Sequence, residues 1–298
     1  MKRFLKHTGV ILIGIIFLSQ LLSGFSLWSL RRSSFYKPSY LINGVKDDSF
    51  DYIILGASTG LTTLDTKVID SITHFKGLNL SMDDTSMSSH YLMLEHFLAE
   101  GKTTSYCILA PSDYNYSSIN QGLSDNDYRF IMYANRDYVK AYYADFKGLP
   151  AQLLEHSRWL PMLGVAYYNT EVFFPSLIAA FQPERHNRFD AFGNYTYPVL
   201  ASADEALSYK TSLNLEFKNP YIEKIKTLCD AHGITLICYL SPIKDQQVKV
   251  ITDAYNVINH SDLLTNNRFF YDEMHVNTDG RLLCSENFGR EFKMNFLK

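Results

Sequence analysis

The chain alternates between apolar runs of strand length and segments with helical spacing, and this alternation restricts its fold more than any other feature. Parallel strands joined by crossover helices produce such a pattern, because the helices then cover both faces of the sheet. We therefore predict an α/β fold, a three-layer α/β/α sandwich with a mostly parallel sheet. The predicted strands cover residues 52–56, 77–80, 106–110, 234–240 and 268–271, and the predicted helices cover 61–72, 86–100, 221–232, 246–258 and 279 onward.

The alternation is interrupted at residues 116–215, a segment rich in Tyr and Phe. We expect helices at 127–145 and 151–160, and residues 188–198 resemble a turn. The segment follows the third predicted strand and so leaves the sheet at its carboxyl edge, where an insertion forms a lid or one wall of a ligand cleft. A structural cap without ligand contact is equally consistent with the sequence. We treat residues 51–298 as one domain that carries this insertion.

Residues 1–32 are predicted to form a membrane anchor. Three basic residues precede an apolar stretch at 9–30, and Arg31 and Arg32 follow it. About 20 residues span a bilayer as a helix, so the stretch is long enough. A cleaved signal segment is the alternative, although its cleavage site is indistinct. The weak charge asymmetry favours a single-pass protein whose domain lies outside the cytoplasm, on the periplasmic side. A polar linker is expected at 33–50.

The net charge and the cysteine spacing limit the classes of partner and cofactor that we expect the chain to bind. The formal net charge is −3 and no basic stripe is visible, which argues against a nucleic-acid partner. Cys107, Cys229, Cys238 and Cys284 form neither a CxxC pair nor a zinc pattern. Cys107 and Cys238 are expected to be buried thiols, and whether they pair in an oxidising compartment is open. We expect no metal site and no cofactor.

Two short segments near opposite ends of the chain contain the residues of a serine nucleophile, a base and an orienting acid. Ser58 follows the first predicted strand in a Gly-Ala-Ser-Thr-Gly turn, and Asp272 and His275 follow the last predicted strand. The carboxyl ends of parallel strands meet at one edge of a sheet, so these three side chains are expected to lie together. Histidine would then take the serine proton while aspartate holds the imidazole tautomer.

The order of these residues disfavours the α/β-hydrolase fold, because several strands precede the serine turn in that fold and its acid and base come from separate loops. The chain instead resembles the SGNH (GDSL-like) hydrolase superfamily, and looks most like its membrane-anchored branch associated with bacterial cell-surface polysaccharides and D-alanyl transfer. The resemblance covers about residues 51–115 and 220–292. Gly-Ala-Ser58 stands where that family has Gly-Asp-Ser, and Asp272 and His275 match its Asp-x-x-His block, with Asn277 and Gly280 after it.

The resemblance also implies an oxyanion hole, and here the chain departs from the family pattern. Ser81 stands where the second block has a glycine, whose backbone N–H group donates to the oxyanion. The third block normally supplies an asparagine side chain, and the nearest candidates are Asp113 and Asn115.

The function implied by the resemblance is an extracytoplasmic serine esterase or O-acyl(acetyl)transferase that acts on cell-surface polysaccharide through acyl-Ser58. Its expected partners are an acylated glycan, the lipid bilayer through the N-terminal helix, and a membrane acyltransferase. The altered second and third blocks support an alternative: a catalytically degenerate scaffold that binds glycan or a membrane partner within a polysaccharide-modifying complex. Hydrolysis and transfer differ only in the acyl acceptor, and the sequence leaves both open.

Overall fold

We describe the protein from a computed structural model that covers residues 1–119, 122–200, 205–209, 211–250, 252 and 254–296. The chain divides into two compact units. The sheet unit comprises Val45–Asn126 and Arg188–Lys298, and the helical unit comprises Met1–Gly44 and Asp127–Asn187. Each unit is described by itself.

The sheet unit is built on a parallel sheet of five strands in the order β2-β1-β3-β5-β7. Its central strands read as almost unbroken apolar runs because both of their faces are covered. Residues β1 Ile54 and β3 Ile108 are register partners, as are β3 Leu109 and β5 Cys238. The five strands are β1 (Ser49–Gly56), β2 (Gly77–Asn79), β3 (Thr103–Ala110), β5 (Thr235–Leu240) and β7 (Asn256–Asn259).

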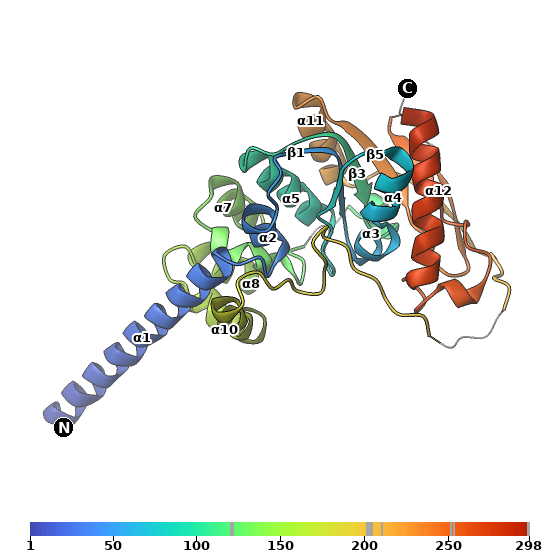
Figure 1. Ribbon diagram of the computed structural model, residues 1–298. Helices are drawn as coiled ribbons and strands as arrows, with labels where there is room; N and C mark the ends of the chain where they lie inside the picture. The colour runs from blue at the N-terminus through green and yellow to red at the C-terminus, as the bar shows by residue number, and fades with distance from the viewer. Residues whose placement is uncertain (120–121, 201–204, 210, 251, 253, 297–298) are drawn as a thin grey trace. The chain divides into compact units, whose positions relative to one another are not determined.

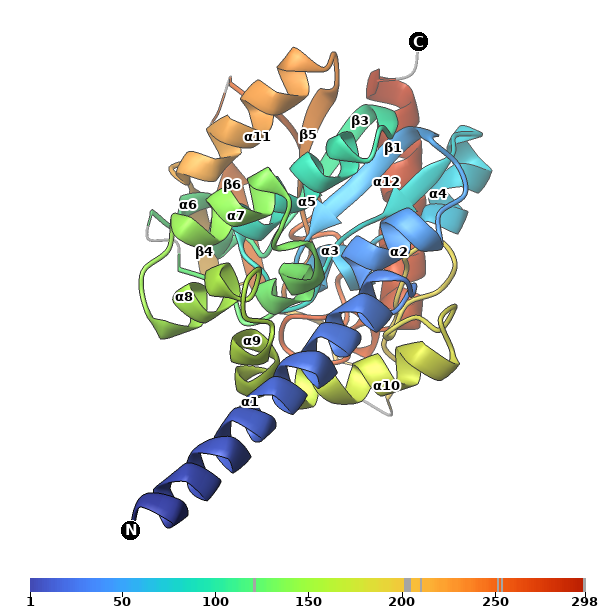
Figure 2. The same cartoon turned by 90° about the vertical axis from the view of Figure 1, so that its left-hand side faces the viewer.

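Helices cover both faces of this sheet, with α4 and α12 on one side and α5 and α11 on the other (Figures 1 and 2). The predicted α/β class with a mostly parallel sheet is therefore confirmed. The helices of the unit are α3 (Ser58–Thr63), α4 (Thr66–Thr73), α5 (Met87–Ala99), α6 (Tyr114–Ser117), α11 (Pro220–Ala231) and α12 (Thr278–Phe296), with a short 3₁₀ turn, η3 (Asn267–Phe269).

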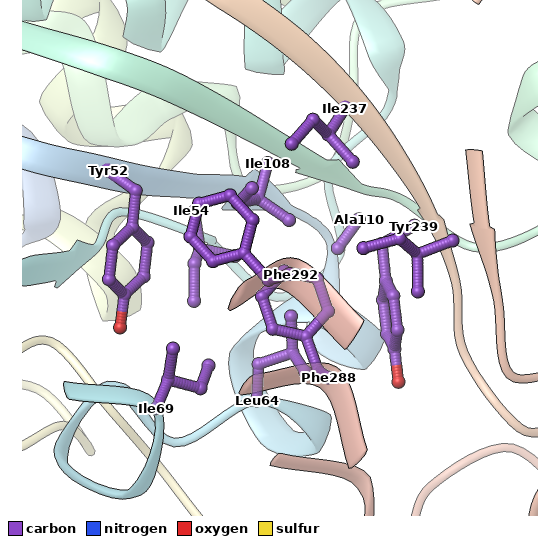
Figure 3. Packing of buried hydrophobic residues seen from close by; sticks show 11 residues of the cluster. Tyr52, Ile54, Leu64, Ile69, Ile108, Ala110, Ile237, Tyr239, Phe288 and Phe292 are labelled. Atoms are coloured by element: carbon purple, nitrogen blue, oxygen red, sulfur yellow. The ribbon is translucent and has the colours of Figure 1, made fainter. Parts of the chain in front are cut away.

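The main core lies between the sheet and the α4/α12 layer. Phe292 of α12 packs against Ile54 and Ile108 of the two central strands, and Ile69 of α4 closes the cluster (Figure 3). All four side chains are fully buried. This packing holds the carboxyl edge of the sheet in place, and the candidate site lies at that edge.

Two sequence predictions near the C-terminus are wrong. The described residues of 246–258 form no helix: β6 (Gln246–Val250) pairs in parallel with β4 (Thr211–Leu215) in a separate two-stranded sheet, and β7 extends the main sheet. Residues 268–271 form no strand of the sheet, because Phe270 is buried locally with Leu264, Val276 and Cys284. Short strands that depend on distant partners leave little periodic signal in the sequence.

The helical unit joins the N-terminal segment to much of the predicted insertion. The linker expected at 33–50 is partly helical, and the Asn43 side chain there donates to the carbonyl oxygens of Arg31 and Ser33. The unit contains α1 (Lys2–Arg31), α2 (Lys37–Asn43), η1 (Asp127–Tyr133), α7 (Asp137–Ala144), α8 (Leu149–His156), α9 (Met162–Tyr167), η2 (Asn169–Phe173) and α10 (Phe174–Phe181).

Helix α1 is long and apolar enough to cross a membrane, and most of its apolar span is exposed. Beyond the middle of the helix, Ser23, Ser26 and Ser29 turn inward and are buried within the helical unit. Elsewhere in the chain, all four cysteines are buried and carry free thiols.

Candidate active site

Ser58 is the first residue of α3, directly after the turn that ends β1. The first N–H groups of a helix have no partner within that helix, so this turn presents backbone donors beside the serine hydroxyl. The turn lies very close to the neighbouring strand: a Cβ atom on Gly56 would lie 2.1 Å from the Ala110 carbonyl oxygen, and one on Gly60 would lie 2.6 Å from the same atom. These glycines therefore permit the close approach of the β3 backbone.

Asp272 and His275 lie in the long connection between β7 and α12 rather than directly after a strand. Asn277 fixes the end of this connection. Its side-chain amide donates to the Arg268 carbonyl oxygen at 2.7 Å, and its Oδ1 atom accepts the N–H of Gly280 at 3.1 Å. One asparagine thus ties the loop together and satisfies a backbone donor of the first turn of α12.

The three predicted catalytic side chains are connected by hydrogen bonds. His275 Nε2 lies 2.8 Å from Ser58 Oγ. On the other side of the ring, His275 Nδ1 lies 2.9 Å from Asp272 Oδ2 and 3.0 Å from Oδ1. With Nδ1 protonated toward the carboxylate, Nε2 is the acceptor that faces the serine hydroxyl. This is the geometry that a serine nucleophile, its base and an orienting acid require.

The pKa of the Asp272 carboxyl lies below the usual value for an aspartate. Partial burial acts to raise its pKa, but hydrogen bonds from the His275 ring and from the backbone N–H groups of Met274 and His275 outweigh burial and lower that pKa. The loop therefore presents a negative charge to the Nδ1 side of the ring, where it stabilises an imidazolium.

Tyr197 packs against the histidine, a contact that no sequence pattern predicts. The Tyr197 ring centroid lies 5.2 Å from that of His275; Tyr197 also stacks on Tyr271 at 4.3 Å and meets Tyr195 edge-on at 5.3 Å. Thr278 Oγ1 donates to the Tyr197 carbonyl oxygen at 2.9 Å and holds the tyrosine backbone near the start of α12. Tyr197 belongs to the turn-like segment 188–198, which has no periodicity that could have revealed the contact.

Ser58 and His275 open into a cavity of about 520 Å³. Its wall includes Asp84, Asp125 and several serines, and no lysine or arginine is among its lining residues in the described part of the chain. Ser118 and the segment 122–125 also line it, so the beginning of the predicted insertion supplies one wall. The cavity is polar, carries negative charge and is large enough for a small ligand.

Asn115 is the predicted oxyanion residue that the structure brings to the cavity. The residue is nearly buried, it lines the cavity, and its backbone carbonyl accepts a hydrogen bond from Asn219 Nδ2 at 2.7 Å. Its own side-chain amide forms no hydrogen bond with the described residues. An amide held in this way is available to donate to a ligand oxygen.

Ser81 and Asp113 are not among the residues that line the cavity. The Ser81 backbone N–H donates to Asn79 Oδ1 at 3.0 Å inside the unit, so it is already satisfied. Asp113 is buried, and neither of its carboxyl oxygens has a hydrogen-bond partner among the described residues. Burial raises the pKa of this carboxyl to about 7. The oxyanion role predicted for Ser81 therefore lacks a free donor, and Asp113 lies behind the cavity wall.

Comparison with known proteins adds no assignment. No protein-family model matches the chain, and no curated protein matches it.

Proposed function

We propose that the protein is a membrane-anchored serine esterase or O-acyltransferase of the SGNH type. The observation that carries the proposal is the continuous set of hydrogen bonds from Ser58 Oγ through the His275 ring to Asp272. Ser58 and His275 lie at the mouth of a polar cavity. Together with Asp272 they supply every proton-transfer group that acyl transfer through a serine needs.

The first half of the reaction forms an acyl-serine. Ser58 Oγ attacks the ester carbonyl carbon while its proton passes to His275 Nε2, and Asp272 stabilises the imidazolium that results. The Ser58 N–H and the Asn115 amide donate to the carbonyl oxygen as it becomes negative. The carbon–oxygen bond to the alcohol then breaks, and that alcohol leaves with the proton held on His275.

The second half repeats these steps with another acceptor. His275 removes a proton from water or from a sugar hydroxyl, the acceptor oxygen attacks the acyl carbon, and Ser58 leaves with the proton. Water gives hydrolysis and a sugar hydroxyl gives transfer.

An acylated, extracytoplasmic polysaccharide is the proposed substrate. Serine hydroxyls and carboxylates line the cavity, and such groups bind sugar hydroxyls by hydrogen bonds. The acidic side chains disfavour anionic acyl groups, so a neutral group such as acetyl fits the wall better. Helix α1 would anchor the chain in the bilayer with its domain on the periplasmic side, beside a membrane acyltransferase that supplies or takes up acyl groups.

One observation favours a second candidate, a catalytically degenerate scaffold that binds glycan. The Ser81 N–H is committed to Asn79, which leaves the oxyanion with fewer donors than the family pattern implies. In that case the cavity would hold an acylated glycan without turning it over.

Hydrolysis of p-nitrophenyl acetate by the full-length chain in detergent micelles separates the two candidates. Ser58→Ala and His275→Ala should abolish turnover. The matched control is Ser112→Ala, because Ser112 lines the same cavity and forms no hydrogen bond with His275; it should retain turnover.

The same variants are then tested for binding of an O-acetylated oligosaccharide. The enzyme candidate predicts that Ser58→Ala binds the sugar and fails to deacetylate it or transfer its acetyl group. Absence of turnover by the folded wild type, together with equal sugar binding by wild type and Ser58→Ala, would support the scaffold instead.

A further inference from the structure

The short helix α10 exposes three of its large apolar side chains and buries two of its small ones. Phe174, Leu177 and Phe181 are exposed, the last at 86%, whereas Ser176 and Ala179 are buried. The exposed residues recur at helical spacing, so they form one face, and the helix contains no charged residue. A helix that is apolar all round is normally covered on every side.

Helix α10 lies against α1 (Figure 2). Ser29 Oγ of α1 donates to the Ser176 carbonyl oxygen at 2.8 Å, so the small-residue face of α10 turns toward the membrane-length helix. The apolar face of α10 is therefore turned away from the body of the helical unit but remains beside α1.

A second exposed apolar pair lies beside the middle of α1. Trp159 is 72% exposed, and Leu160 follows it. The Gln20 side chain fixes this segment to α1: it donates to the Trp159 carbonyl oxygen and accepts the Met162 N–H, both at 3.3 Å. We call Trp159, Leu160, Phe174, Leu177 and Phe181 the apolar collar.

The length of α1 indicates what covers the collar. From Phe4 to Ser19 the helix runs free of the rest of the unit for about 24 Å, at 1.5 Å per residue. The hydrocarbon core of a bilayer is about 30 Å thick. A spanning α1 must therefore remain in hydrocarbon for roughly one further turn beyond Gln20, which is the level of Trp159 and Leu160.

We propose that the apolar collar is embedded in the bilayer, at the boundary between acyl chains and headgroups, on the side where α1 leaves the membrane. This inference rests on the proposed anchoring of α1. The exposed aromatic and aliphatic side chains have the character of an interfacial membrane surface, and they continue the lipid-facing surface of α1.

The charges around α1 agree with this depth. Arg31 and Arg32 end the helix about 16 Å beyond Gln20, at headgroup height. Neither forms an ion pair with a described residue, and their guanidinium carbons lie 5.6 and 5.0 Å from the rings of Tyr133 and Trp28. Arg158 pairs with Glu155 at 3.8 Å, and its guanidinium carbon lies 5.4 Å from the centre of the Trp159 ring.

The chain has two tryptophans, which makes the proposal directly testable. The full-length Trp28→Phe variant leaves Trp159 as the reporter, and the Trp159→Phe variant leaves Trp28. Each is reconstituted into phosphatidylcholine vesicles with unmodified lipid and into vesicles whose acyl chains are brominated close to the headgroup. Vesicle flotation first establishes that the chain is membrane-bound.

The proposal predicts that brominated lipid quenches Trp159, beside Gln20, and also Trp28, which lies about 12 Å further along α1 at the level where Ser29 holds α10. It also predicts a blue-shifted Trp159 emission in unmodified vesicles. Chains that float but show no quenching of Trp159 would overturn the proposal and leave the anchor intact; a protein partner or second copy that covers the collar would give this result. Chains that do not float would overturn the anchor and the collar together.

Discussion

The two units of this chain differ in the burial of several of their largest apolar side chains. In the sheet unit, Phe288 and Phe292 are completely buried between helix and sheet, and the exposed cavity is polar. The helical unit has a buried core too, including Phe130, but it leaves Trp159 and Phe181 open to the surroundings. The sheet unit also exposes large apolar side chains, including Ile119 and Met294, but the apolar surface proposed to face lipid belongs to the helical unit. The proposed chemistry and the proposed anchoring therefore belong to different units.

The largest expected effect tests whether the chemistry resides in the sheet unit alone. Asp272→Asn should slow acylation of Ser58 by about 10³–10⁴-fold, because the histidine loses the group that fixes its tautomer and stabilises its charge. Asp137→Asn, on the exposed start of α7 in the helical unit, is the matched control and should leave the rate unchanged. The measurement is the burst of p-nitrophenol from a stoichiometric amount of ester. An equal rate in both variants would remove Asp272 from the mechanism.

The second prediction compares one phenylalanine from each unit. Phe292→Ala removes a fully buried ring and should lower the free energy of unfolding by about 3–5 kcal/mol. Phe181→Ala removes an exposed ring and should change that free energy by no more than about 0.5 kcal/mol. Denaturant unfolding in the same detergent measures both. A large loss from Phe181→Ala would mean that its ring is packed against protein.

The third prediction compares two glycines. Gly60→Ala would bring a methyl group within 2.6 Å of the Ala110 carbonyl oxygen, and relieving that clash should cost about 1–3 kcal/mol. Gly24→Ala on α1 meets no atom within 4 Å and should stabilise the helix by up to about 1 kcal/mol. Thermal unfolding of the two variants should therefore shift in opposite directions, and shifts of the same sign would contradict the close packing of the serine turn.

The last comparison concerns two buried carboxyls. Asp127 in the helical unit accepts a hydrogen bond from Tyr142 Oη at 2.7 Å, whereas Asp113 in the sheet unit has no such partner among the described residues. Burial raises the pKa of Asp113 from 3.8 to about 7 in the folded protein. Between these values the folded state keeps a proton that the unfolded state releases, so stability falls as pH rises.

The slope from Asp113 is at most about 1.4 kcal/mol per pH unit, and it vanishes above the folded pKa. Asp113→Asn should remove this slope and raise stability at neutral and alkaline pH relative to the wild type. Unfolding free energies measured across that range check the sign. An unchanged pH profile would mean that the Asp113 carboxyl is solvated or hydrogen-bonded.

The sheet could be predicted where strands are buried on both faces. Residues 52–56, 106–110 and 234–240 are mainly apolar runs; the first two lie in β1 and β3, and the third coincides with β5 from Thr235 onward. The edge strand β7 and the separate strand β6 are short and partly polar, so their residue patterns do not favour a strand over a helix. The juxtaposition of Ser58 with His275 followed from topology, although the last strand was placed wrongly.

The parts of the site that could not be predicted depend on loops. Tyr197 reaches His275 from an irregular segment, and Ser81 loses its N–H to a neighbouring Asn79 side chain; neither contact has a sequence signature. The apolar collar could not be predicted from the sequence for a related reason. The run at 174–181 is equally apolar whether protein or lipid covers it, and only the fold shows which face Ser176 and Ala179 occupy.

The central claim is that Ser58 is an activated nucleophile, and a fluorophosphonate probe tests it most directly. The full-length chain is treated with the probe in detergent, and the modified residue is located by intact-mass and peptide mass spectrometry. A stoichiometric adduct on Ser58 that is absent from His275→Ala and present in Ser112→Ala is the predicted result. A folded chain that forms no adduct, or forms one equally well without His275, would contradict the account.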